Sequence, residues 1–216
     1  MAGLHKKKLL VEGDSDKRVI PVLIEANGIS WGETKSEAVV YIESYGGVTQ
    51  LLAPDVISTE LKASRLSALG LIVDADEDPA SRWQSIRNAC LRSIRDLPEN
   101  LPETGLIHNT SYGVKFGVWI LPDNKISGML ETFLALMIPS QGESLWTYAQ
   151  SVVQEAKHQG APFKQEHTDK AHIHTWLAWQ DPPGRQLHNA VIERIIDPNH
   201  PNAQTFVNWF KDLYDL

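Results

Sequence analysis

The chain has 216 residues and a formal net charge of −7 at pH 7, with 42% hydrophobic and 22% charged residues. These values are ordinary for a globular protein, and the length suffices for one core or for one domain with a sizeable appendage. The negative charge argues against a basic surface that coats nucleic acid. No apolar run approaches the roughly 20 residues that span a bilayer. The start of the chain also lacks the about 7–15 apolar residues of a secretory signal. We therefore expect a cytoplasmic protein without membrane association.

The first elements are a strand, a helix and a second strand. Residues 6–12 carry a continuous apolar run, which is typical of a buried strand. Gly13 permits a tight turn, and the following helix ends near Asn27. Pro21 lies inside this helix and predicts a kink or an irregular first turn. Residues 38–44 form the next strand.

The alternation continues to residue 138. Two short helices, a strand, a helix, a strand and an apolar helix are predicted in chain order over residues 48–54, 55–66, 69–74, 79–96, 114–122 and 126–138. Pro98 and Pro102 mark a loop before the strand at 114–122. Because strands and helices alternate, we expect an α/β, Rossmann-like fold, with a mainly parallel central sheet flanked by helices and right-handed crossovers.

The last part of the chain has a different pattern. Helices are predicted at about 142–158, 166–179, 187–196 and 203–214, and no strand is convincing. We divide the chain into an α/β domain, residues 1–138, and a C-terminal helical extension, residues 139–216. We expect the extension to pack on the sheet and not to form an independent domain.

Acidic residues stand where two predicted strands end. Glu12 ends the first strand, and Asp74 and Asp76 end the strand at 69–74. Ligands of open α/β sheets bind at the carboxyl ends of strands. Two like charges about 4 Å apart repel by roughly 4 kcal/mol at an effective dielectric constant near 20, and a bound cation is the usual remedy. Hard oxygen ligands suit Mg²⁺ or Mn²⁺, so the sequence predicts an acidic metal site.

Other acids are candidates for the same site. Asp76 lies two residues after Asp74, and in an extended segment both side chains point to one side. Asp16 lies one helical turn after Glu12, although a helix-terminal acid that interacts with the dipole is the alternative. Asp123 follows the strand at 114–122 in the equivalent position. Glu131 lies in an apolar helix, where a carboxylate needs a partner or an ion.

Other reactive residue types have simpler interpretations. The single cysteine, Cys90, excludes an internal disulfide, and we interpret it as a buried structural thiol. His172 and His174 match no known zinc spacing, so we favour surface or helix-packing roles. The arginines of the helix at 79–96, including Arg82, are interpreted as a solvated face.

The two strand-end signatures, LLVEGDSDKRVI and LGLIVDADED, together resemble the TOPRIM domain of topoisomerases, primases and the overcoming-lysogenization-defect (OLD) nucleases. That family has a glutamate after its first strand and an Asp-x-Asp after its third, here Glu12, Asp74 and Asp76. This likeness covers roughly residues 6–138. Two later motifs, VWILPDNKISGMLETFL and DKAHIHTWLAWQDPPG, are similar to those of a mostly bacterial group of TOPRIM-like proteins related to the OLD nucleases.

The resemblance implies roles for these residues. In nuclease-like TOPRIM proteins the acid at Glu12 is a metal ligand or a general base, and the acid at Asp16 binds a second metal. A further acid, here either Asp123 or Glu131, completes the second site, and the choice between the two stays open. Lys170 resembles a late lysine of the OLD nucleases, which could steady a pentavalent phosphate or the leaving oxygen. A surface lysine is the alternative.

We therefore expect a metal-dependent phosphodiesterase that cleaves DNA or RNA. The resemblance to the OLD nucleases also implies a setting in defence against phage. The predicted catalytic residues are Glu12, Asp74, Asp76 and Lys170, and the predicted metal ligands are Glu12, Asp16, Asp74, Asp76, Asp123 and Glu131. The alternative is a non-catalytic regulatory module that binds a metal or a nucleotide and acts with a partner protein. The sequence has no Walker A pattern, so an ATPase partner is expected to be a separate chain. The sequence does not determine the oligomeric state, and a homodimer is one alternative.

Overall fold

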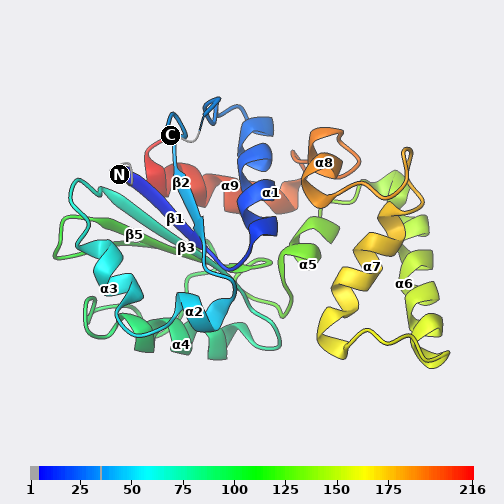
Figure 1. Ribbon diagram of the computed structural model, residues 1–216, viewed down its shortest axis with the longest axis horizontal. Helices are drawn as coiled ribbons and strands as arrows, with labels where there is room; N and C mark the ends of the chain where they lie inside the picture. Colours follow the sequence, from blue (N-terminus) through cyan, green and yellow to red (C-terminus); the bar gives the residue numbers. More distant parts are fainter. Residues whose placement is uncertain (1–4, 35) are drawn as a thin grey trace.

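The computed structural model describes residues 5–34 and 36–216, and its centre is a single β-sheet (Figure 1). Within these residues the sheet has five strands in the order β2-β1-β3-β5-β4. The strands are β1 (Lys7–Val11), β2 (Tyr41–Ser44), β3 (Ala68–Asp74), β4 (Leu106–Asn109) and β5 (Lys115–Leu121). β1 pairs in parallel with β2 and β3, and β3 pairs in parallel with β5. The predicted α/β class with a mainly parallel, Rossmann-like sheet is confirmed.

The antiparallel edge strand β4 was not predicted. It runs from Leu106 opposite Val118 to Asn109 opposite Lys115, and so covers the outer edge of β5. Its four residues are too few to show a clear alternation of buried and exposed side chains. The segment becomes a strand because the edge of β5 offers it backbone partners. The predicted loop at Pro98 and Pro102 is confirmed, and β4 follows it.

The helices follow the predicted order with shorter bounds in several places. They are α1 (Asp14–Ala26), α2 (Val48–Leu51), α3 (Val56–Leu61), α4 (Pro79–Cys90), α5 (Leu130–Ala135), α6 (Glu143–His158), α7 (Thr168–Leu177), α8 (Leu187–Ile192) and α9 (Pro201–Tyr214). Short 3₁₀ turns, η1 (Ser140–Gly142) and η2 (Gln165–His167), precede α6 and α7. The helix α1 continues through Pro21. The helix α5 begins four residues later than predicted, because Gly128 and Met129 have non-helical backbone angles.

Two apolar clusters lie on the two faces of the sheet. Successive residues of β3 point to opposite faces of the sheet, so Ile72 belongs to one cluster and Leu71 and Val73 belong to the other. The helices α2, α3 and α4 cover one face, and α1 and α9 cover the other (Figure 1). Cys90 is buried in the cluster beneath α4, which agrees with a structural thiol.

The helix α9 packs closely on the sheet. A Cβ atom at Gly70 of β3 or at Gly117 of β5 would overlap the side chains of Tyr214 and Leu213. The hydroxyl of Tyr214 donates a hydrogen bond of 2.8 Å to the Lys8 carbonyl. The cluster under α1 and α9 contains residues from both sides of position 138. The division into domains at that position stays a prediction.

The helices α6 and α7 form an antiparallel pair beside α5, away from the centre of the sheet (Figure 1). Among the described residues, no helix combines the length and the apolar character needed to cross a membrane. Lys170, near the start of α7, faces the carboxyl ends of β1 and β3.

Candidate functional site

Glu12 and Asp74 lie next to each other because β1 and β3 are parallel neighbours. Val11 pairs with Ile72 in the register, so both acids follow at the same edge of the sheet. The Asp74 backbone N–H donates a hydrogen bond of 2.9 Å to Glu12 Oε1. Burial is the main cause that raises the pKa of Glu12, and the nearby charge of Asp76 raises it further. The structure therefore brings these two predicted acids together.

Asp16 enters the same region from the first turn of α1. Its Oδ2 accepts a hydrogen bond of 3.0 Å from the Gly13 backbone N–H, so it also caps the helix. The side chain is buried, with an exposed fraction of 8%. Burial, followed by repulsion from Glu12 and Glu131, raises its pKa from 3.8 to about 7. Asp16 therefore caps α1 and also lies beside the other acids.

Glu131 comes from the first turn of α5 and is buried, with an exposed fraction of 5%. The preceding residue, Leu130, donates its backbone N–H to Asp74 Oδ1 at 3.0 Å. Burial raises the pKa of Asp74 well above its ordinary value, and the charges of Asp16, Glu12, Glu131 and Asp76 add to the effect. These five carboxylates, from β1, α1, β3, the following loop and α5, are called the acidic cluster below.

The charge of Asp76 acts on Asp74, but the backbone at Asp76 does not have the extended conformation that the sequence predicts. Its φ angle is 55°, so the segment after β3 is not extended there. Two backbone hydrogen bonds, of 3.0 and 2.8 Å, join Asp76 to Gly128. The Asp76 carboxylate forms an ion pair with Arg82 of α4. The backbone is therefore not extended at Asp76 as predicted, although the Asp74 and Asp76 side chains still line the same cavity.

Asp123 is at the equivalent strand end but is engaged in its own turn. Its Oδ1 accepts hydrogen bonds of 3.0 Å from the backbone N–H groups of both Lys125 and Ile126. It is not among the charges that act on Asp74. Of the two acids left open, Glu131 is thus the one that the structure places in the acidic cluster.

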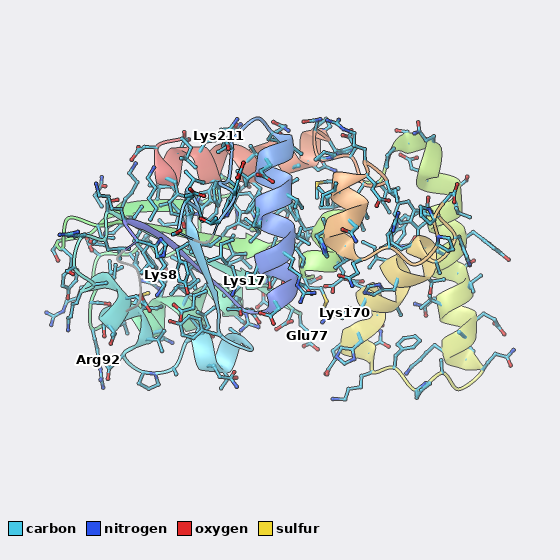
Figure 2. The ribbon with its side chains drawn as sticks, turned by 45° about the horizontal axis from the view of Figure 1, so that its top comes forward. Lys8, Lys17, Glu77, Arg92, Lys170 and Lys211 are labelled. Carbon is cyan, nitrogen blue, oxygen red and sulfur yellow. The ribbon has the colours of Figure 1, made fainter. Side chains whose placement is uncertain are left out.

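An open cavity of about 730 Å³ lies over the acidic cluster. Glu12, Asp74 and Asp76 line one side of it, and Arg82 of α4 and Lys170 of α7 also face it. Lys170 is exposed and has no ion pair or hydrogen bond to another of the described residues. Figure 2 shows Lys170 together with Glu77, another lining residue, between the sheet and the α6–α7 pair.

The chemistry of the cluster suits a hard divalent cation, since it supplies carboxylate oxygens alone. In the part of the chain that the structure describes, however, no three Asp, Glu, His or Cys side chains are arranged as a ready metal cage. The reason is visible in their partners: Asp76 turns to Arg82, and Asp16 turns to the Gly13 amide.

Two features of the site were missed from the sequence. Arg82, interpreted as part of a solvated face, has a largely buried side chain in the cavity wall. Thr132 of α5 donates a short hydrogen bond to Asp169 of α7, next to Lys170. The spacing of Arg82, six residues after Asp76 and in the helix that follows, was the available signal. Nothing in the sequence indicates the contact between Thr132 and Asp169.

The histidines of α7 lie away from this chemistry. His172 is buried and contacts the edge of Trp146, with ring centroids 6.1 Å apart. Burial lowers its pKa, while Asp169 acts in the opposite direction. This packing agrees with the structural interpretation of the histidine.

Comparisons with known proteins identify a family and a distant likeness. A family model described as "Protein of unknown function (DUF3226)" matches residues 6–215. No curated protein matches the chain. Two solved structures of the C-terminal region of the Xanthomonas campestris pv. campestris OLD protein are similar to it at 16% identity. The structure phased with iodine has a TM-score of 0.43 and covers 99% of this chain and 97% of that chain. The one phased with platinum has a TM-score of 0.35, with 97% and 90% covered. Likeness at this level does not transfer an activity, and membership of the TOPRIM family stays a prediction.

Proposed function

The chain belongs to the DUF3226 family of proteins of unknown function, and we propose that it is a divalent-metal-dependent phosphodiesterase that cleaves nucleic acid. The observation that carries this proposal is the acidic cluster at the carboxyl edge of the sheet. The Asp74 backbone amide donates a hydrogen bond to Glu12 there, and the charges of Asp16 and Glu131 act on Asp74. Buried carboxylates that repel one another are stabilised by protons or by a bound cation.

The acidic cluster would hold Mg²⁺ or Mn²⁺, with Glu12 and Asp74 as the central ligands. Asp16, Asp76 and Glu131 would supply further oxygens, and Asp123 is left out because its carboxylate serves its own turn. When bound, such cations supply positive charge that stabilises the attacking and leaving oxygens of a phosphodiester.

The residues of the chain have separate roles in this proposal. Asp16 titrates near neutral pH, which suits a group that exchanges a proton for a cation. Lys170 faces the same cavity from α7 and is placed to balance negative charge on a bound phosphate. The choice of nucleic acid as substrate rests on the resemblance of the two strand-end signatures to the TOPRIM domain.

The test is Mn²⁺-dependent cleavage of supercoiled, linear and single-stranded DNA and of RNA by wild type and Asp74→Asn. We expect Asp74→Asn to lose about 1000-fold in rate or more. The variant should keep or raise its melting temperature without metal, because one repelling charge is removed and the amide oxygen can still accept from Leu130.

The matched control is Asp123→Asn, since Asp123 follows the neighbouring parallel strand and the side-chain oxygen of an asparagine there can accept the same hydrogen bonds from the Lys125 and Ile126 amides. Its cleavage rate should stay within about twofold of wild type. An Asp74→Asn protein that cuts as well as the wild type would refute the enzymatic proposal.

One observation favours a second candidate, a non-catalytic module that binds a metal or a nucleotide and regulates a partner protein. The Arg82–Asp76 ion pair already neutralises part of the cluster, and the described residues hold no ready metal cage. Stabilisation by Mn²⁺ in a thermal melt, without cleavage of any of these substrates, would support this candidate.

A further inference from the structure

Among the lysine and arginine side chains that the structure describes, Arg82 stands out because a donor of its guanidinium is buried and unpaired. Its side chain is only 14% exposed, and Nη2 forms the ion pair with Asp76. Its Nε is buried and has no hydrogen-bond partner among the described residues. A buried donor without an acceptor is unfavourable, so an acceptor that reached Nε after a shift of the side chain would stabilise the guanidinium.

The guanidinium lies where an anionic ligand of the cavity would be bound. Arg82 lines the cavity together with Glu12, Asp74 and Asp76. Its positive charge acts on Glu12 as well, where it lowers the pKa against the effect of burial. Lys170 faces the same space from α7. The cavity thus has carboxylates in its floor and two cationic side chains, from different helices, in its walls.

The ion pair with Asp76 competes with both uses of these groups. A carboxylate that neutralises Arg82 is less available to a cation, and a guanidinium that neutralises Asp76 is less available to an anion. A divalent cation carries twice the charge of the guanidinium, and so competes well for the Asp76 oxygens. A released guanidinium can then donate from Nε and one Nη to two oxygens of a phosphate.

We infer that Arg82 is a phosphate-binding residue whose guanidinium is occupied by Asp76 until a cation binds the acidic cluster. The ligand is a phosphate group of the nucleic-acid substrate, so the inference rests on the proposed function and adds to it. Metal binding and substrate binding are thereby linked: the cation takes Asp76, and the phosphate takes Arg82. Without a cation the ion pair keeps the site closed to anions.

The experiment uses the full chain and the variants Arg82→Ala and Arg82→Lys. Mn²⁺ affinity is measured by isothermal titration calorimetry. Affinity for a labelled single-stranded oligonucleotide with a hydrolysis-resistant phosphorothioate backbone is measured by fluorescence anisotropy at saturating Mn²⁺. Adenosine monophosphate in place of the oligonucleotide distinguishes a free nucleotide phosphate from a nucleic-acid backbone.

We expect opposite changes in Arg82→Ala. Mn²⁺ should bind several-fold more tightly, because the competing guanidinium is gone, and the oligonucleotide should bind about tenfold more weakly or worse. Arg82→Lys should return Mn²⁺ affinity towards wild type but recover oligonucleotide affinity only in part, because an ammonium group lacks the two-pronged geometry. If Arg82→Ala does not fold, Arg82→Lys carries the test, since it keeps the charge and the buried stem.

Arg92→Ala is the matched control. Arg92 also forms an ion pair with an aspartate, Asp55, at 3.4 Å, but it is exposed and lies at one end of the molecule, whereas Lys170 lies nearer the middle (Figure 2). Both affinities of this variant should stay within about twofold of wild type.

The outcomes separate the inference from the proposed function. Unchanged or weaker Mn²⁺ binding by Arg82→Ala, or unchanged oligonucleotide binding, overturns the inference and leaves the metal site in place. Weaker binding of adenosine monophosphate with unchanged oligonucleotide binding overturns nucleic acid as the source of the phosphate. A wild-type protein that binds no Mn²⁺ overturns the proposed function, and the inference with it.

Discussion

Acidic residues follow the parallel strands at two places along the carboxyl edge of the sheet, and their carboxylates have different hydrogen-bond partners. One place is the end of β1 and β3, and the other is the end of β5. At β1 and β3 the carboxylate of Glu12 accepts a hydrogen bond from the backbone amide of Asp74, and the carboxylate of Asp74 accepts one from the Leu130 amide of α5. At β5 the acid Asp123 turns back and accepts from its own following amides. The lesson is that a strand end places an acid near the edge, while the turn after it decides whether the carboxylate is free to bind a ligand.

The turn after β5 is a structural feature in its own right. Asn124 has a φ angle of 68°, and its side-chain oxygen accepts a hydrogen bond of 2.7 Å from the Ile120 amide. Its amide group donates to the Glu103 carbonyl at 3.1 Å. These bonds satisfy buried backbone groups at the end of the strand. The helix α5, which follows this turn, brings Glu131 to the cluster in place of Asp123.

The largest expected effect is the loss of cleavage when Glu131 is changed. Glu131→Gln should lower Mn²⁺-dependent cleavage by about 1000-fold, because it removes a charged oxygen ligand from the cluster. Cleavage rates at saturating substrate measure it. Glu143→Gln, which changes an exposed acid in the first turn of α6, is the control and should have no effect. A large loss in Asp123→Asn with none in Glu131→Gln would break the comparison between the strand ends.

The next effect is a pH dependence of stability at the β1 side of the site. The folded-state pKa of Asp16 is about 7, above the ordinary 3.8, so between these values the folded protein binds more protons than the unfolded chain. Stability of the metal-free protein should therefore fall as pH rises, by up to about 3 kcal/mol between about pH 5 and about pH 7. Urea unfolding at several pH values measures this slope.

Asp16→Asn should flatten that slope, because the amide does not titrate. Asp14→Asn is the matched control, since Asp14 is an exposed acid in the same helical turn and bonds to Ser44. An equal slope in wild type and Asp16→Asn would show that Asp16 is not the group responsible.

A smaller effect is expected on stability when the turn after β5 is changed at Asn124. Asn124→Ala should destabilise the protein by about 2 kcal/mol, because the Ile120 amide loses its side-chain acceptor and alanine disfavours a positive φ angle. Mn²⁺ affinity of the folded variant should not change. Denaturant unfolding and calorimetry test the two parts, and a selective loss of Mn²⁺ binding would contradict a purely structural role.

The smallest effect concerns the contact between the two cavity walls. Thr132 accepts a 3.0 Å hydrogen bond from the Met129 amide and donates to Asp169 beside Lys170. Thr132→Val should cost about 1 kcal/mol in stability and loosen α7 against α5. Hydrogen exchange of α7 amides reports that loosening. Thr147→Val, which removes a hydroxyl bonded only within α6, should leave α7 exchange unchanged.

The sequence alone was sufficient to predict the order of most helices and strands and the mainly parallel character of the sheet. The apolar runs of β1, β3 and β5, separated by helical periodicity, predict a mainly parallel sheet because such runs are buried on both faces. Adjacency of Glu12 and Asp74 follows from that topology, since parallel strands end at one edge. The strand β4 could not be predicted, because a segment of four residues depends on the partner edge and not on its own pattern.

The tertiary structure decided which charged groups face one another. The sequence gives only the positions of Asp76, Asp123 and Arg82. Their side chains are directed by a left-handed backbone turn at Asp76, by the turn amides that Asp123 accepts from, and by the ion pair between Arg82 and Asp76. Those directions depend on backbone angles and on distant partners such as Gly128, which no local pattern contains. Strand polarity is a property of the chain, whereas the meeting of side chains requires the packed sheet and its helices.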